Sequence, residues 1–234
     1  MSSFVLKIIA LVTMILDHVG AELFPQYEWL RYVGRLSFPI YAFLIAQGFA
    51  HTSDRKRYAI RLGAFALISE VPHDLLFYNT WLEFGYQNIM FELLFGFLAI
   101  WCIDKAIKEK KYLFLVIVPI LVVSTAILNF SYDIYGMVLI IVAYLFVGKD
   151  VASGLGSAVT TYCFNGFIQA GFKTFGRYIP VLTYNPAQVF AVLAAIPIMF
   201  YNGKRGKYSL KWFFYISYPA HLLLLWVIKI LLFT

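Results

Sequence analysis

The chain has 234 residues, of which 62% are hydrophobic and 19% aromatic, whereas only 13% are charged. Soluble domains have roughly 45–50% apolar and about 25% charged residues, so this composition excludes a soluble globular enzyme, a disordered chain and a nucleic-acid-binding protein. The net charge of +7 would suggest nucleic acid in a soluble protein. In a membrane protein, basic residues gather in the loops beside the bilayer instead. The composition therefore indicates a polytopic membrane protein.

A transmembrane helix needs about 20 mainly apolar residues, and the apolar runs between charges and turn signals predict about nine spans (eight to ten). They cover residues 4–21, 34–51, 58–77, 88–104, 112–128, 132–148, 151–172, 180–201 and 211–232. The seventh run is rich in Gly, Ser and Thr, which suits close packing between helices. The sequence shows no repeat or long linker. We therefore expect an all-α transmembrane helical bundle in which residues 1–234 form a single integral-membrane domain.

Loop charges predict how this bundle is oriented. Basic residues cluster in the loops after the second, fourth, sixth and eighth runs, for example at 55–57 and 204–207. The positive-inside rule places these loops and the N-terminus in the cytoplasm. We expect the first run to stay as a helix rather than be cleaved as a signal peptide, because Asp17 and His18 interrupt the supposed cleavage region.

Ionisable residues inside apolar runs are costly and therefore indicate function. In the predicted topology, His18, Arg35 and His73 fall near the outer leaflet. Most of the acids outside loops fall there too: Asp17, Glu70, Asp74, Glu92 and Asp133. Residues at span ends can also be interfacial groups that contact headgroup water. Glu70, His73 and Asp74 share one helix face at i, i+3 and i+4. That face can be a structural ion-pair cluster as readily as a proton-transfer site.

His221 lies ten residues beyond Lys211, about 15 Å along a helix and hence near mid-membrane. Tyr218 shares its face, so the two could line an aqueous path from the cytoplasm. The alternative is a buried histidine bonded to a neighbouring helix. The four histidines show no helical metal-pair spacing, and no metal site is predicted.

Several short segments carry a further signal. They are Leu6–Ala10, Met14–Gly20, Gly34–Pro39, Ala46–Thr52, Ser69–Pro72, Tyr201–Gly206 and Phe214–Leu222. In collinear order over nearly the whole chain, these segments resemble the TraX family, which is named after the protein that N-acetylates F-type conjugative pilin. Two positions depart from the family pattern, because Gln47 stands where Glu is expected and Glu92 where Thr is expected.

The resemblance implies an acyltransferase of the bacterial inner (cytoplasmic) membrane. Such an enzyme would move an acetyl group from cytoplasmic acetyl-CoA to an amine or hydroxyl acceptor near the outer leaflet. The acceptor would be a protein such as a pilin-like N-terminus, a glycan or a small amine. In related membrane acyltransferases a histidine at the end of the first span is the usual catalytic base, and His18 matches that position. Asp17 or Glu70 would orient its ring, and Arg35 would hold that acid or the oxyanion.

The same resemblance places the anionic end of acetyl-CoA against the basic cytoplasmic face. The residues expected to bind this cofactor are His51, Arg55, Lys204, Arg205, Tyr218 and His221. His221 would lie along the path of the pantetheine arm or would handle a second proton.

Two other functions remain open at this point. A proton-coupled small-molecule transporter would use the intramembrane acids and histidines as a proton relay, although the sequence shows no two-fold internal similarity. A non-catalytic scaffold for pilus or envelope assembly would leave the acidic layer unexplained.

Overall fold

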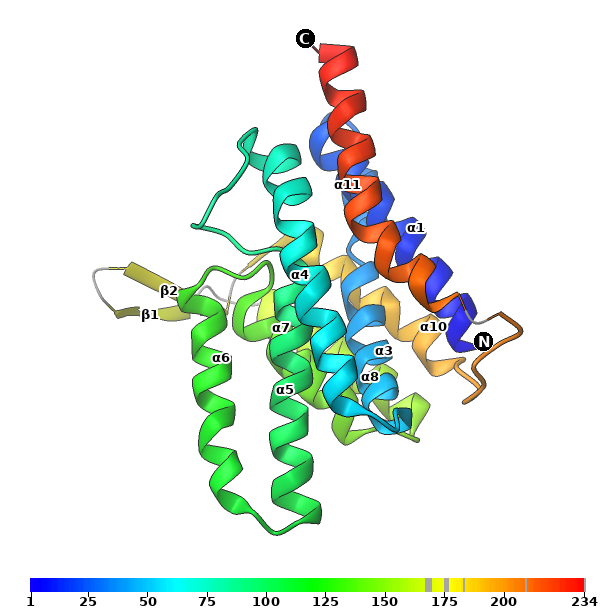
Figure 1. Cartoon of the computed structure of the whole chain (residues 1–234), viewed down its shortest axis with the longest axis vertical. Coiled ribbons are helices and arrows are strands. Elements are labelled where there is room, and N and C mark those ends of the chain that lie inside the picture. Colours follow the sequence, from blue (N-terminus) through cyan, green and yellow to red (C-terminus); the bar gives the residue numbers. More distant parts are fainter. Residues whose placement is uncertain (167–169, 175–176, 183, 209, 234) are drawn as a thin grey trace.

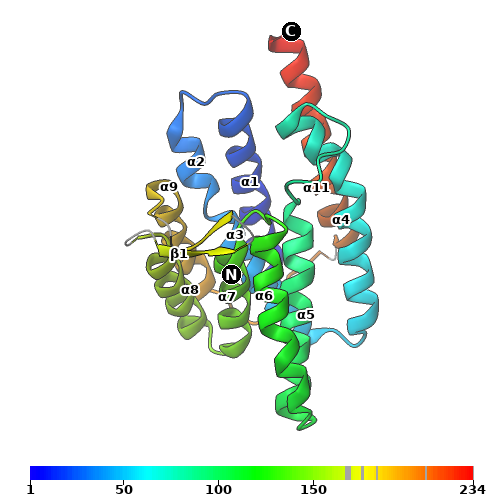
Figure 2. The ribbon, with the colours of Figure 1, turned by 90° about the vertical axis from the view of Figure 1, so that its left-hand side faces the viewer.

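The computed structural model describes residues 1–166, 170–174, 177–182, 184–208 and 210–233. In this part of the chain, nine helical segments follow one another in alternating directions (Figures 1 and 2). They are α1 (Ser3–Glu22), α2 with α3 (Glu28–Gly34 and Ser37–His51), α4 (Arg55–Tyr78), α5 (Ile89–Lys108), η1 with α6 (Tyr112–Val116 and Ile117–Ile127), α7 (Asp133–Leu145), α8 (Asp150–Asn165), α9 with η2 and α10 (Pro186–Val189, Phe190–Ala194 and Ala195–Met199), and α11 (Lys211–Phe233). The expectation of a helical bundle is confirmed.

Three helical stretches among the described residues are long and apolar enough to cross a membrane: Ser3–Glu22, Glu28–His51 and Lys211–Phe233. Helices α4 and α5 have 24 and 20 residues, but both carry several charges. The remaining apolar helices are shorter, at 10–17 residues. Among the described residues, each predicted span thus overlaps a helical segment, but only three of these segments have the length and apolarity of a membrane span.

The seventh and eighth predicted runs have different boundaries from those expected. Helix α8 ends at Asn165, and residues 170–174 and 177–182 pair as a short antiparallel hairpin, β1 (Ala170–Thr174) with β2 (Arg177–Leu182). Helix resumes only at Pro186, because the Asn185 side chain accepts a hydrogen bond from the Gln188 N–H at 3.1 Å and a proline is favourable at the first helical position. Residues 167–169 of the seventh run lie outside the described residues.

The second predicted run starts earlier than expected and is divided in two. Helix α2 begins at Glu28 and ends at Gly34, and α3 begins at Ser37. Pro39 lies in the first turn of α3, where the backbone N–H groups have no helical partner, so it does not interrupt the helix. The short α2 places two arginines, Arg31 and Arg35, beside α1.

Helix α3 is the centre of the bundle. It packs against α1, α5 and α7, and it carries buried aromatic side chains along most of its length. Phe49 of α3 meets Phe97 of α5 edge to face at 5.2 Å between ring centroids, a geometry that aromatic pairs prefer. Helix α11 packs on α4 and α1 at the side of the bundle, and its free end extends beyond them (Figure 1).

The close approach of α1 and α2 depends on a residue without a side chain. A Cβ added at Gly34 would lie 2.3 Å from Cβ and 2.6 Å from Cα of Asp17. We therefore expect Gly34→Ala to separate the two helices and to destabilise the protein by about 1–3 kcal/mol. The measurement is the midpoint of thermal aggregation of the detergent-solubilised protein, followed by size-exclusion chromatography.

Gly63→Ala in α4 is the matched control. A Cβ there would meet Leu94 Cδ2 at an ordinary 3.6 Å, and alanine favours a helix by about 1 kcal/mol over glycine. Its midpoint should stay the same or rise. An equal loss of stability in both variants would contradict the packing argument.

Candidate functional site

The candidate site is built around two adjacent residues of α1. Asp17 and His18 point about 100° apart on the helix, so each meets a different neighbour. Asp17 faces α2, where it contacts Arg31, and His18 faces α11, where it contacts His221. Both residues line a cavity between these helices.

His18 and His221 form a direct pair. Nδ1 of His18 lies 2.8 Å from Nε2 of His221, and the two rings are nearly parallel, with an angle of 7° between their planes. Nδ1 of His221 lies 2.8 Å from the carbonyl oxygen of Ser217, one turn earlier in α11. A chain of two hydrogen bonds therefore runs from His18 to the backbone of α11.

This chain determines where the protons lie when both rings are neutral. The Ser217 carbonyl can only accept, so Nδ1 of His221 must carry the proton and Nε2 must accept. Nδ1 of His18 therefore donates, and Nε2 of His18 keeps its lone pair. We predicted that Asp17 or Glu70 would orient His18; the structure gives that place to His221, because both acids have other partners.

Asp17 is buried between two arginines. Its carboxylate lies 2.9 Å from Arg31 and 3.2 Å from Arg35, and Arg31 also donates to the Asp17 carbonyl oxygen at 3.0 Å. Arg35 donates in addition to Oε1 of Gln188 at 3.3 Å, whereas its Nε has no hydrogen-bond partner among the described residues. One carboxylate and two guanidinium groups leave an excess positive charge beside His18, which suits a negatively charged group in the cavity.

The cavity at this end of the bundle has a volume of about 230 Å³. Polar groups from several parts of the chain line it, including Arg31, Arg35, His73 and Ser131, together with aromatic and aliphatic side chains. Tyr132 forms part of its wall and stacks on Phe38 with 3.9 Å between ring centroids. Two of its lining residues, Arg31 and Tyr78, also have exposed surface, at 33% (side chain) and 40%.

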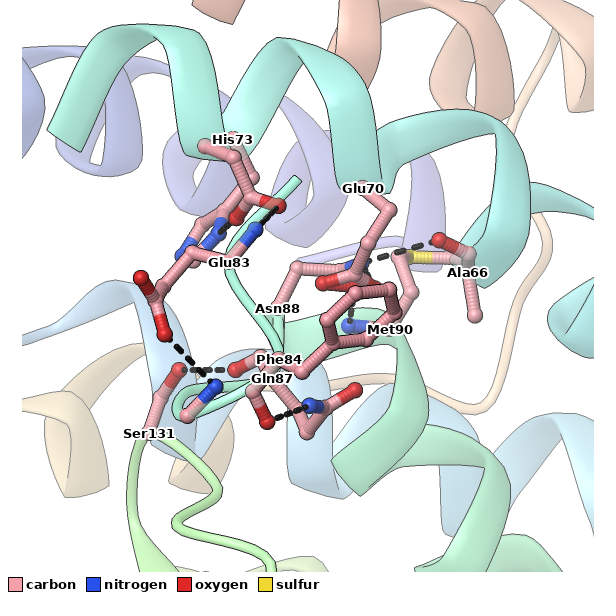
Figure 3. A network of polar contacts seen from close by, with 11 residues as sticks. Ala66, Glu70, His73, Glu83, Phe84, Gln87, Asn88, Met90 and Ser131 are labelled. Carbon is pink, nitrogen blue, oxygen red and sulfur yellow. Dashed lines mark hydrogen bonds and ion pairs between the residues drawn. The ribbon is translucent and has the colours of Figure 1, made fainter. Parts of the chain in front are cut away.

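A second hydrogen-bonded group lies on the α4 side of this cavity (Figure 3). His73 Nδ1 is 2.9 Å from Asp74 Oδ1, and the Glu83 backbone N–H donates to Asp74 Oδ2 at 2.7 Å. Asp74 has no exposed surface. The loop that supplies Glu83 is held in turn by Ser131, whose hydroxyl donates to the Gln87 carbonyl oxygen at 3.3 Å.

Glu70 lies one turn before this pair. Its Oε2 accepts from the buried Asn88 side chain at 2.8 Å, and the same amide donates to the Ala66 carbonyl oxygen at 2.8 Å. Glu70, His73 and Asp74 each offer a ligand atom within 4.8 Å of the others, so they could hold a metal ion. In the structure, hydrogen bonds already engage Nδ1 of His73, both oxygens of Asp74 and one of Glu70.

A larger cavity of about 680 Å³ opens at the opposite end of the bundle. Cationic side chains from α1, α4, α11 and the preceding loop line it: Lys7, Arg61, Arg205 and Lys211. The loop lies against the N-terminus, because Ser3 N–H donates to the Lys204 carbonyl oxygen at 2.9 Å and Phe4 N–H to that of Arg205 at 3.1 Å.

The two cavities adjoin each other. Both are lined by the same four residues, which form the neck between them: Tyr41, Met90, Leu93 and Phe214. The neck is mainly apolar and aromatic. These four side chains therefore lie between the basic cavity and the cavity that contains His18.

The residues predicted to bind a cofactor occupy different places. His51 and Arg205 line the larger cavity, and Tyr218 lines the smaller one. His221 is among the lining residues of neither and lies behind His18, and Lys204 also lines neither.

Arg55 is directed away from both cavities. It pairs with the buried Asp104 at 2.7 Å, and Lys108 and the Tyr144 hydroxyl contact the other oxygen of the same carboxylate at 2.7 and 2.8 Å. Arg55 also stacks over Phe49 at 4.2 Å. A buried carboxylate requires such partners, so Arg55 has a structural role in joining α4, α5 and α7.

Sequence reasoning assigned no role to several residues of the site. Lys7, Arg61 and Lys211 were not predicted to line a cavity, although a cation inside the first apolar run was a visible signal. For the face of Glu70, His73 and Asp74, the sequence left open an ion-pair cluster or a proton-transfer site. Because neighbouring residues on a helix point about 100° apart, the spacing did not indicate the direct contact between His73 and Asp74.

The comparisons with known proteins cover nearly the whole chain. The family model described as TraX protein matches residues 2–229. The chain is 28% identical over 244 residues to "Probable fimbrial assembly protein FimC, serogroup H1" from Dichelobacter nodosus, covering 99% of this chain and 97% of that protein. No solved structure matches.

The hydrogen-bond chain makes a spectroscopic prediction. In protein labelled with ¹⁵N-histidine, at a pH where both rings are neutral, we expect His18 and His221 to carry their protons on Nδ1 rather than on Nε2. The measurement is the ¹⁵N chemical shift of the ring nitrogens, assigned with His18→Gln and His221→Gln. A protonated Nε2 on His18 would contradict the proposed orientation.

Proposed function

Because the chain belongs to the TraX family, we propose that it is a membrane acetyltransferase that moves an acetyl group from acetyl-CoA to an amine or hydroxyl acceptor. The similarity to a probable fimbrial assembly protein supports a fimbrial or pilin-like N-terminus as the acceptor. The observation that carries the proposal is the pair of adjoining cavities, one basic and one containing an oriented histidine.

The larger cavity suits the nucleotide end of acetyl-CoA. Its volume of about 680 Å³ is within the range of ligand pockets, and four cationic side chains match the phosphate groups of the donor. The positive-inside rule puts this basic end in the cytoplasm, where acetyl-CoA is found. The apolar neck then suits the pantetheine arm, which would place the thioester in the smaller cavity.

His18 has the features of a general base. Its Nε2 lone pair is available when the ring is neutral, and it would take the proton from the attacking nitrogen or oxygen while that atom bonds to the thioester carbonyl carbon. The carbon–sulfur bond then breaks, and coenzyme A leaves as the thiol once its sulfur has gained a proton. The acetyl group remains on the acceptor.

Two neighbours support this chemistry. His221 accepts from Nδ1 of His18 and so holds the ring in the productive tautomer; it is a positioning residue. Arg35, whose Nε has no hydrogen-bond partner, would stabilise the oxyanion that forms on the thioester carbonyl. The acceptor would enter where Arg31 and Tyr78 reach the surface, on the side away from the donor.

The first test removes the base. His18→Gln should lower the rate of acetyl transfer by about 10²–10⁴-fold, because general base catalysis contributes that much, while the affinity for coenzyme A stays unchanged. The assay follows radiolabelled acetyl-CoA into a synthetic peptide with the N-terminal sequence of a fimbrial subunit. The same peptide with a blocked N-terminus is the negative control. Full activity of the variant would refute the role of His18.

The second test concerns the donor cavity. Arg61 lines the cavity, whereas Arg57, one turn earlier on α4, is 81% exposed and pairs with Asp54. Arg61→Gln should weaken coenzyme A binding about tenfold, because a hydrogen bond to a charged group contributes about 1.5–3 kcal/mol. Arg57→Gln should leave the dissociation constant from calorimetry unchanged.

Two outcomes would overturn the proposal itself. One is equal weakening by the two arginine variants, which would mean that only net charge matters. The other is an absence of coenzyme A binding together with uptake of a small molecule driven by a pH gradient in vesicles, which would favour a transporter.

A further inference from the structure

The imidazole of His73 is oriented by a carboxylate. Asp74 is fully buried, and in the described part of the chain its one ion-pair partner is His73. The Glu83 backbone N–H engages the other oxygen of Asp74. A carboxylate in this position accepts a hydrogen bond from Nδ1–H of His73, so the reactive nitrogen of this ring is Nε2.

Nε2 of His73 is available to a substrate. Within the described residues no hydrogen bond engages Nε2 of His73, and the ring lines the same cavity of about 230 Å³ as His18. Phe77 lies beside both rings, with its centroid 5.3 Å from His18 and 5.0 Å from His73. Two histidines on different helices therefore face one small space, each with its Nδ1 occupied.

The two histidines differ in what lies behind them. Nδ1 of His18 contacts a neutral imidazole, whereas Nδ1 of His73 contacts a buried carboxylate. An opposite charge stabilises an imidazolium far more than a neutral partner does, especially away from water. Arg31 and Arg35 stand closer to the His18 side of the cavity, beside Asp17, and oppose a positive charge there. The surroundings therefore stabilise the protonated form of His73 more than that of His18.

We propose that His73, held by Asp74, is a second catalytic residue: the general acid that protonates the departing sulfur of the acyl donor. The inference rests on the proposed acetyl transfer. As the acceptor bonds to the carbonyl carbon, His18 Nε2 takes the acceptor's proton. As the carbon–sulfur bond breaks, the electron pair stays on sulfur, which takes the proton from His73 Nε2. Transfer of one proton from His18 to His73, through water in the cavity, restores the starting state.

The test uses two donors that differ in their need for an acid. Acetyl-CoA releases an alkyl thiolate that gains from protonation, whereas S-(4-nitrophenyl) thioacetate releases a thiolate that is stable as an anion. For each donor the rate of acetyl transfer to the same peptide is compared between variant and wild type, so that differences in donor affinity cancel.

His73→Gln should lower the rate with acetyl-CoA by about 100-fold and the rate with the activated thioester by less than about threefold. His18→Gln should lower both rates, because the base acts on the acceptor. Asp74→Asn keeps the size of the side chain but removes the charge, so it should show the same donor selectivity with a smaller loss. Unchanged coenzyme A affinity of each variant shows that it is folded.

Equal losses with the two donors for His73→Gln, or no loss with acetyl-CoA, would overturn the role of His73 and leave the proposed function intact. Activity of the wild type that is abolished by a chelator and restored by a divalent metal would also overturn it, because a metal held by Glu70, His73 and Asp74 would engage the proton donor. No acetyl transfer by the wild type from either donor would instead refute the proposed function.

Discussion

A charge that is removed from water must find a partner, and this constraint organises the polar part of the bundle. Three buried aspartates meet it in three ways. Asp17 lies between two arginines, Asp74 between an imidazole and a backbone N–H, and Asp104 among an arginine, a lysine and a tyrosine hydroxyl. The contacts of Asp17 join α1 to α2, those of Asp104 join α5 to α4 and α7, and those of Asp74 hold α4 to the loop that contains Glu83.

The three groups differ in whether they leave a donor or acceptor atom available to bind a ligand or to transfer a proton. The partners of Asp104 surround it completely, so that group joins helices and does no more. Around Asp17, a guanidinium nitrogen of Arg35 has no hydrogen-bond partner, and the pair of arginines faces a cavity. Behind His73, Asp74 occupies one ring nitrogen and leaves the other toward the same cavity. Partners with an unused donor or acceptor beside a cavity are the ones suited to bind or transfer a proton.

The separation of the two cavities matches a reaction between substrates that approach from opposite sides. The basic cavity and the histidine cavity share only the residues of their neck, which are mainly apolar. An anionic donor that enters at one end would bring its reactive group to the other through this neck, while the acceptor need not pass the basic end. In the proposed reaction, a neck lined by side chains would also limit the access of water to the thioester and so favour transfer over hydrolysis.

Much of the fold could be predicted from local pattern. Nine apolar runs correspond to nine helical segments, and the layer that contains Asp17, His18, Arg35 and Glu70 is where the histidine cavity lies. The pairing of residues 170–174 with 177–182 could not be predicted, because the apolar run that begins near residue 180 looks the same for a strand and for a helix over a few residues.

Composition and hydropathy alone were sufficient to predict a helical membrane protein with its acids gathered toward one end, because both depend on the solvent that surrounds each residue. The pairing of side chains was not accessible in the same way. His18 and His221 are 203 positions apart in the chain, and their contact depends on how α1 and α11 are rotated about their axes. Arg55 looked like any other loop cation, yet a buried carboxylate on α5 engages it. The packing of whole helices decides which side chains become partners. The spacing of residues along one helix carries no information about that packing.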